Sequence, residues 1–228
     1  MRVEIKICGL CRPEDAALAA EAGADYLGVV LAPGGRRSRS MEEAAAIFGA
    51  APDVRRVGVF VDAVVDEVVA AARRLGLSVV QLHGGEAPQV AAELRAAGEW
   101  QVWKAIRPRD RSEFLAGVEA YGAVVDAVLV DGWSAAAPGG TGARFPWDEV
   151  AAVRSSVPAG LRFFVAGGLE PGNVAEAVAR LAPDGVDVSS GVEAVVGEKA
   201  PEKVRAFVAA AREAAAGSPG GPAARMSL

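Results

Sequence analysis

The sequence predicts an α/β protein built as a single (β/α)8 TIM barrel. Short runs rich in β-branched residues alternate with Ala-rich stretches of helical periodicity, about eight times over roughly 200 residues, and this repeated order is typical of that fold. No break in composition suggests a second domain. We therefore expect one barrel domain over residues 1–215, with a doubly wound open sheet as the alternative arrangement.

The expected elements follow in order along the chain. The strand-like runs cover residues 3–8, 24–31, 56–62, 78–83, 100–106, 126–131, 161–168 and 185–190. Helical stretches such as 12–24 and 173–183 lie between them. Helix starts and ends are marked by first-turn prolines and terminal glycines, namely Pro13, Pro171, Gly23, Gly76 and Gly98. Residues 216–228 are rich in Gly and Pro without periodicity, which predicts a disordered tail.

Composition limits the classes of function. The chain has 228 residues, is 52% hydrophobic and carries a formal net charge of −5, so a sizeable core is expected and a general nucleic-acid binder is not. No signal peptide and no membrane-spanning run is present in the sequence, and two cysteines cannot form a disulfide framework. We expect a soluble cytoplasmic protein, monomeric or homodimeric. The net charge does not exclude a small anionic ligand, because a local site can be positive on an acidic protein.

Strand parity indicates polar groups inside the barrel. Val3, Ile5 and Ile7 share one face of the first strand, while Glu4, Lys6 and Cys8 share the face directed at the interior. Gln81 shares a face with His83, and Asp187 with Ser189. Because charged interior residues are costly unless they are paired, this pattern points to a site near the carboxyl ends of the strands.

Two Gly-rich turns predict phosphate binding. AGGL, with Gly167 and Gly168, follows the seventh strand, and SSGVE, with Ser190 and Gly191, follows the eighth. TIM barrels frequently bind phosphate with this pair of loops, although each turn alone is also an ordinary turn sequence. PGGTG, which ends at Gly142, is interpreted equally well as an anion-binding loop or as a flexible segment.

An acid and a base can be placed on two strands. Cys8 and Asp131 end the first and sixth strands, on opposite sides of the expected barrel mouth, where an isomerisation would need both groups. A buried small side chain and a helix N-cap are the alternative roles for these two residues, and periodicity alone slightly favours them. Cys8 and Cys11 also form a C-x-x-C pair, but the fold is not thioredoxin-like. Zinc would need two more ligands, and the chain has one histidine, His83, and no further cysteine, so we expect no metal.

A set of motifs in order identifies a family. The chain contains KICGL, ADYLGVV, VGVFVD, VQLHGGE, KAI, LVDG, GGTG, VAGGLEPGNV and GVDVSSGVE. Over roughly residues 2–210 the chain resembles the phosphoribosylanthranilate isomerases of tryptophan biosynthesis. The resemblance implies an Amadori rearrangement without a cofactor, with Cys8 as the general base, Asp131 as the general acid, and a phosphorylated substrate held by the Gly-rich turns.

The chain departs from the family pattern at three places. The usual Ser-Pro-Arg after the second strand is Gly35-Arg36-Arg37 here, so Arg37 is expected to bind the anthranilate carboxylate, with Arg36 or Arg39 as alternatives. Cys11 stands where the family usually has Thr. The family's Phe-Asp-Trp is Phe-Pro-Trp here, with no obvious consequence.

Further expectations concern the neighbours of these residues. Asp187 is expected to pair with Lys6 or to bind a sugar hydroxyl, and His83, Asp62 and Lys104 to be structural. A regulatory disulfide between Cys8 and Cys11 is a hypothesis that the local turn must permit. Another phosphosugar-processing barrel and a non-catalytic barrel that binds phosphorylated ligands are the alternative functions.

Overall fold

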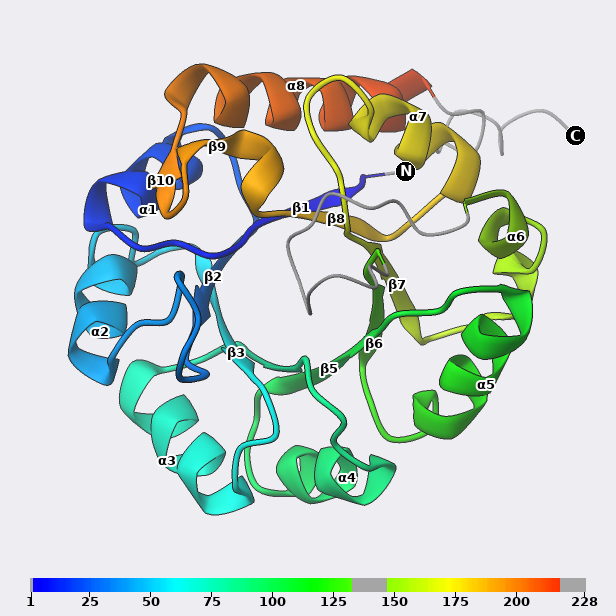
Figure 1. The fold of residues 1–228 in the computed structure, drawn as a ribbon, viewed down its shortest axis with the longest axis horizontal. Helices are drawn as coiled ribbons and strands as arrows, with labels where there is room; N and C mark the ends of the chain where they lie inside the picture. Colours follow the sequence, from blue (N-terminus) through cyan, green and yellow to red (C-terminus); the bar gives the residue numbers. More distant parts are fainter. Residues whose placement is uncertain (1, 133–146, 218–228) are drawn as a thin grey trace, which may run out of the picture.

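Eight parallel strands close into a barrel, and helices surround it (Figure 1). The computed structural model describes residues 2–132 and 147–217. The barrel strands are β1 (Glu4–Ile7), β2 (Tyr26–Val30), β3 (Arg55–Phe60), β4 (Val79–Leu82), β5 (Gln101–Ile106), β6 (Ala127–Val130), β7 (Arg162–Val165) and β8 (Gly185–Val188). Every predicted strand is therefore confirmed.

The helices follow the strands in sequence. They are α1 (Pro13–Glu21), α2 (Met41–Gly49), α3 (Val65–Leu75), α4 (Pro88–Ala96), α5 (Arg111–Tyr121), α6 (Trp147–Ala151), α7 (Val174–Leu181) and α8 (Pro201–Gly217), with short 3-10 helices η1 (Arg154–Ser156) and η2 (Ser190–Val192). A hairpin of β9 (Glu193–Val195) and β10 (Glu198–Lys199) precedes α8. Within the part of the chain that the structure describes, no helix has the length and apolar character needed to cross a bilayer.

Closure occurs between the first and last strands. β1 pairs with β8 in parallel, with Lys6 beside Asp187 and Ile7 beside Val188. This pairing excludes the doubly wound open sheet. It also brings together two charged residues that are 181 positions apart in the sequence.

The core forms two layers, as strand parity predicts. Val3, Ile5 and Ile7 pack in the outer layer between strands and helices. Cys8 belongs to the inner layer. The inner layer is filled by rings, and Trp103 lies with its centroid 4.2 Å from that of Phe164, so the barrel interior is packed rather than open.

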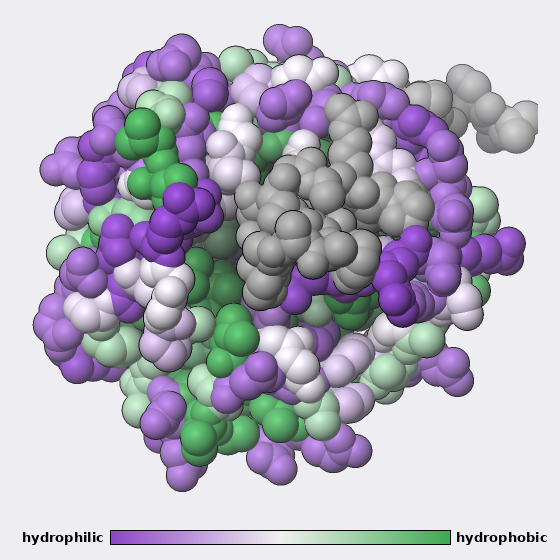
Figure 2. All heavy atoms as spheres, in the orientation of Figure 1, coloured by the Kyte–Doolittle hydropathy of each residue, from purple (hydrophilic) through white to green (hydrophobic). Residues whose placement is uncertain are grey.

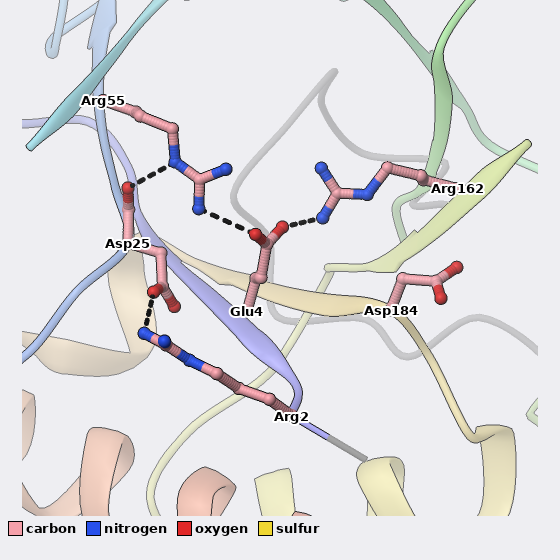
Figure 3. A pocket seen from close by; sticks show the side chains of 6 residues that line it. All are labelled: Arg2, Glu4, Asp25, Arg55, Arg162 and Asp184. Carbon is pink, nitrogen blue, oxygen red and sulfur yellow. Dashed lines mark hydrogen bonds and ion pairs between the residues drawn. The ribbon is translucent and has the colours of Figure 1, made fainter.

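The amino-terminal end of the barrel is closed by charged residues (Figure 3). The Glu4 carboxylate lies between the guanidinium groups of Arg55 and Arg162 and pairs with both. The Tyr26 hydroxyl joins this network, accepting from Arg55 and Arg162 and donating to Glu4. A cavity of about 450 Å³ beside the network is lined by Arg2, Glu4, Asp25, Arg55, Arg162 and Asp184. Arg2 pairs with Asp25, and Asp184 pairs with Arg154 outside the lining.

Two predicted element boundaries differ from the structure, one at the start of α7 and one at the end of α8. Pro13 begins α1, as expected, but the prediction that Pro171 lies in the first turn of a helix is wrong because α7 begins at Val174. The Asn173 side chain holds a turn before the helix, accepting from Glu170 N at 2.9 Å and donating to Gly168 O at 2.8 Å. At the end of the chain α8 reaches Gly217 and thus includes two residues of the predicted tail; residues 218–228 lie outside the described part.

Candidate active site

The predicted site residues gather at the carboxyl end of the barrel. Each lies at or just after the end of a strand: Cys8 after β1, Arg37 in the loop after β2, His83 after β4, Asp131 after β6, Gly167 and Gly168 after β7, and Ser190 and Gly191 after β8. Gly142 lies outside the described residues. On the face shown in Figure 2, apolar side chains gather over the β9–β10 hairpin, and Val195 and Val196 are among the exposed large apolar residues of that hairpin.

Cys8 lies in a charged part of the barrel interior. Its side chain is buried, and Gly28 of the neighbouring strand β2 provides the space that it occupies. A methyl group added to the Gly28 Cα would come within 2.9 Å of Cys8 Sγ and 3.1 Å of Lys6 Nζ. The sulfur and the ammonium nitrogen therefore lie close to the same point, and a side chain at position 28 would displace them.

Lys6 is fully buried and paired. Its Nζ donates to Asp187 Oδ1 at 3.0 Å, with Asp187 almost as buried as its partner. The pair predicted from strand parity is confirmed. Burial lowers the pKa of Lys6, but the negative charges of Asp187 and Cys8 outweigh burial and leave this pKa above its ordinary value. The interior therefore holds a charged ammonium beside the sulfur.

The pKa of the Cys8 thiol is raised. Burial is the largest cause, and the charge of Asp187 adds to it. The positive charges of Lys6 and Lys199 act in the opposite direction and limit the rise. The free site therefore favours the thiol over the thiolate at neutral pH, and the nearby cations stabilise the thiolate when it forms.

Asp131 is held by three neighbours. Its Oδ1 accepts from Gly132 N at 2.9 Å, and its Oδ2 lies 3.3 Å from His83 Nε2 and 3.6 Å from Arg107 Nε. Burial raises the pKa of Asp131, but His83, Arg107 and the Gly132 N–H outweigh burial and hold the pKa below its ordinary value. The carboxylate form is therefore favoured in the free site.

The contact between His83 and Asp131 was missed by sequence reasoning, which assigned His83 a structural role only. Gln81 Nε2 lies 3.0 Å from His83 Nδ1. With the amide donating to Nδ1, the ring hydrogen is on Nε2 and is directed at Asp131. Strand parity places Gln81 and His83 on one face, but the sequence does not show that Asp131, which follows β6, lies beside His83.

Arg37 is fixed by a bidentate ion pair. Its Nε and Nη2 donate to the two carboxylate oxygens of Glu193 at 2.8 and 2.6 Å. Glu193 also accepts from Lys199 Nζ at 3.2 Å, and Lys199 donates to Ser189 O at 3.0 Å. The carboxylate thus occupies one edge of the Arg37 guanidinium and leaves Nη1 on the other edge.

The two alternatives to Arg37 are placed differently. Arg39 donates to the backbone carbonyls of Cys11 and Ser38, and Arg36 is exposed to solvent. The Arg37 side chain, in contrast, runs close to Gly9, since a Cβ added there would lie 2.7 Å from Arg37 Cδ. Arg37 therefore lies nearest to the residue that follows Cys8, while Arg39 contacts the loop further along, at Cys11.

The two predicted phosphate loops touch each other. A Cβ added to Gly191 would lie 1.9 Å from Leu169 O, in the loop after β7. Gly167 and Gly168 adopt φ values of 75° and 68°, which side chains rarely adopt. A Cβ on Gly167 would also lie 2.0 Å from Gly132 N and 2.8 Å from Asp131 Oδ1, so this glycine is required where β6 and β7 end.

Cys11 belongs to a different environment from Cys8. Both cysteines are free. Cys11 Sγ lies 3.5 Å from Gly9 O and 3.9 Å from Arg37 O, whereas Cys8 packs inside the barrel. In residues 2–132 and 147–217, no group of three or more His, Cys, Asp or Glu side chains could hold a metal ion.

Asp62 and Lys104 both contact the loop after β4, in keeping with the structural roles expected for them. Lys104 Nζ pairs with Glu86 Oε2 at 2.6 Å, and both side chains are buried. Asp62 Oδ1 accepts from Gly85 N at 2.7 Å. These contacts stabilise the loop after β4, which carries His83.

Comparison with known sequences decides the family. A model of the N-(5′-phosphoribosyl)anthranilate isomerase family matches residues 5–210. The chain belongs to this family. Among curated N-(5′-phosphoribosyl)anthranilate isomerases, that of Citrifermentans bemidjiense is 46% identical over 213 residues, which cover 93% of this chain and 98% of the relative. That of Rubrobacter xylanophilus is 41% identical over 210 residues, covering 92% and 98%.

Solved phosphoribosylanthranilate isomerases share the fold. The crystal structure from Thermotoga maritima matches with a TM-score of 0.84 at 32% identity, covering 92% of this chain and 99% of that chain. The structure from Thermus thermophilus matches with a TM-score of 0.80 at 37% identity, covering 91% and 98%. A further isomerase structure, with a TM-score of 0.81 at 31% identity and coverage of 92% and 99%, is a complex with reduced 1-(o-carboxyphenylamino)-1-deoxyribulose 5-phosphate.

Proposed function

We propose that this chain converts N-(5′-phosphoribosyl)anthranilate to 1-(2-carboxyphenylamino)-1-deoxyribulose 5-phosphate by an Amadori rearrangement, in tryptophan biosynthesis. Membership of the isomerase family supports the reaction. The observation that carries the proposal is the placement of Cys8 and Asp131 at the ends of β1 and β6, at the same mouth as the two touching glycine loops. A substrate that spans the mouth meets a base, an acid and a phosphate-binding turn.

Asp131 is the general acid of the proposed reaction. It donates a proton to the furanose ring oxygen, the C1′–O bond breaks, and the lone pair of the anilino nitrogen forms the C1′=N bond of a Schiff base. The His83 N–H and the Gly132 N–H direct the carboxylate at the mouth of the barrel. Both contacts stabilise the carboxylate that remains after the proton has left.

Cys8 is the general base. As a thiolate it removes the C2′ proton, and the C–H electron pair forms the C1′=C2′ bond while the iminium electrons return to nitrogen, giving an enolamine. Tautomerisation of the enolamine, in which C1′ gains a proton and the C2′ hydroxyl loses one, gives the ketone. The anilino nitrogen donates its lone pair when the ring opens and accepts an electron pair when the C2′ proton is removed, so the reaction needs no cofactor.

The remaining residues bind the two ends of the substrate. The loops with Gly168, Ser190 and Gly191 provide backbone N–H groups for the phosphate, and Gly142 is a further candidate for substrate contact. Arg37 binds the anthranilate carboxylate through the guanidinium edge that Glu193 leaves free. Asp187 is the candidate for a sugar hydroxyl through its second oxygen, since Oδ1 accepts from Lys6.

The test is turnover of phosphoribosylanthranilate, measured as loss of anthranilate-type fluorescence. Cys8→Ala and Asp131→Asn are each expected to lower kcat by at least about 100-fold, whereas Cys11→Ser is the matched control and keeps wild-type turnover. Wild-type protein that binds phosphorylated ligands without turnover would instead support a non-catalytic barrel. Turnover of a different phosphosugar would support another barrel enzyme.

A further inference from the structure

Lys6 is buried inside the barrel, outside the set of residues assigned to the reaction. We propose that Lys6 is a positioning residue for the base: its ammonium, held by Asp187, faces the Cys8 sulfur and supplies the positive charge against which the thiolate forms. This inference rests on the proposed role of Cys8. It deepens the mechanism because it assigns the base a cation fixed within the barrel strands, next to the sulfur.

The position of Lys6 beside Cys8 on β1 depends on the two adjacent strands, β2 with its glycine at position 28 and β8 with Asp187. Lys6 and Cys8 are two residues apart at the end of β1 and point to the same interior face. Sγ lies 2.9 Å and Nζ 3.1 Å from the position that a Gly28 Cβ would take. Asp187, beside Lys6 on β8, accepts from Nζ at 3.0 Å and fixes the ammonium in this place.

A purely structural role does not account for this arrangement. A buried ion pair costs desolvation and is often no more stabilising than a well-packed apolar pair. Here the pair lies in the interior at the carboxyl end of the barrel, next to the only sulfur in the inner layer of described residues. An apolar residue at position 6 would fill the space equally well, but it would remove the cation that the barrel strands hold beside a developing thiolate.

The other charged groups that face the sulfur come from three elements. Asp187 on β8 opposes the thiolate, whereas Lys199 on β10 and Arg37 after β2 favour it. Lys199 and Arg37 both pair with Glu193, and Arg37 is the proposed ligand of the substrate carboxylate. Of these three cations, Lys6 is the one held by barrel strands, so its position depends neither on a loop nor on the substrate.

The test uses the thiol itself. In a Cys11→Ser background, the thiolate absorbance at 240 nm is followed against pH, with the Cys8→Ala/Cys11→Ser protein as the blank. Adding Lys6→Met is expected to move the titration midpoint upward by about one pH unit or more. The rate of alkylation by iodoacetamide at a fixed pH below the midpoint should fall by about tenfold, because one pKa unit is a tenfold change in thiolate fraction. An unchanged midpoint and rate would overturn the proposal.

A second pair of variants covers loss of folding. Lys6→Met leaves the Asp187 carboxylate buried without its partner, so Asp187→Asn and Lys6→Met/Asp187→Asn are compared in the same background after their folding has been checked by circular dichroism. Asp187→Asn removes an opposing negative charge and should lower the midpoint. The double variant should titrate at least about one pH unit above Asp187→Asn. Equal midpoints in these two proteins would contradict a role for the Lys6 charge.

The outcomes separate this inference from the proposed function. The titration needs no substrate, so it measures the coupling of Lys6 to Cys8 whether or not the protein turns over. Turnover that survives Cys8→Ala would refute Cys8 as the base and, with it, the role of Lys6 in the reaction. Turnover lost in Cys8→Ala together with an unmoved titration in the Lys6 variants would refute the role of Lys6 alone.

Discussion

Glu193 holds Arg37 through both carboxylate oxygens, at 2.8 Å to Nε and 2.6 Å to Nη2. The two residues are 156 positions apart and belong to the hairpin after β8 and the loop after β2. The pair fixes the guanidinium plane, so the orientation of the free edge of Arg37 depends on Glu193.

The first prediction follows from this pair. Glu193→Gln keeps one acceptor and removes the charge, so the Arg37 side chain is held less tightly and the substrate carboxylate meets a less ordered partner. We expect KM to rise about tenfold with a smaller change in kcat. Steady-state kinetics measure both. Glu42→Gln, which removes the exposed partner of Arg74, is the control and should leave KM unchanged; an equal KM in the Glu193 variant would contradict the prediction.

A second prediction concerns pH. The reaction needs protonated Asp131 and ionised Cys8, but the pKa of Asp131 is lowered and the pKa of Cys8 is raised. Between the pKa of Asp131 and the pKa of Cys8, each unit of pH raises the thiolate fraction of Cys8 tenfold and lowers the protonated fraction of Asp131 tenfold. The two fractions multiplied together therefore stay constant. We expect kcat/KM to be flat between about pH 7 and 9, since this parameter reports the free enzyme. A single sharp optimum within that range would be inconsistent with these protonation states.

The third prediction tests the contact that the sequence did not reveal. In His83→Ala, Asp131 loses its 3.3 Å neighbour, and among the described residues Gly132 N is the group that stays within hydrogen-bond distance. The carboxyl group is then less well oriented, and we expect kcat to fall about tenfold with little change in KM. Gln81→Leu, which removes the partner of His83 Nδ1, should produce a smaller fall of the same kind. Wild-type kcat in both variants would show that the contact has no part in the reaction.

The fourth prediction uses two glycines with positive φ. Gly167 has no space for a side chain, whereas nothing lies within 4 Å of the Cβ position of Gly160, whose φ is 98°. Both alanine variants bear backbone strain of about 1–2 kcal/mol, but only Gly167→Ala must displace Gly132 and Asp131. Chemical denaturation should therefore show a larger loss of unfolding free energy for Gly167→Ala, and only this variant should lose turnover. Similar behaviour of the two proteins would refute this interpretation.

Much of the fold could be read from local patterns. Strand runs and helix signals follow from periodicity, and their eightfold repeat favoured a barrel, with an open sheet as the alternative. In a closed barrel β8 lies beside β1, so strand parity offered Lys6 or a sugar hydroxyl as the partner of Asp187. The contacts of Arg37 with Glu193 and of His83 with Asp131 depend on how loops and distant strands meet, which no local pattern encodes. The prediction of a helix start at Pro171 was wrong for a related reason. The Asn173 side chain hydrogen-bonds to backbone groups ahead of α7 and holds a turn there.

Because the amino-terminal end of the barrel is closed, the site is reached from the carboxyl end of the strands. Glu4, Arg55 and Arg162 seal the bottom, and the aromatic layer of Trp103 and Phe164 lies in the interior above them. Substrate and product must therefore use the same opening and cannot pass one another in transit. Departure of the rearranged sugar is thus a compulsory step before the next molecule enters, and product that accumulates outside will compete for entry with fresh substrate.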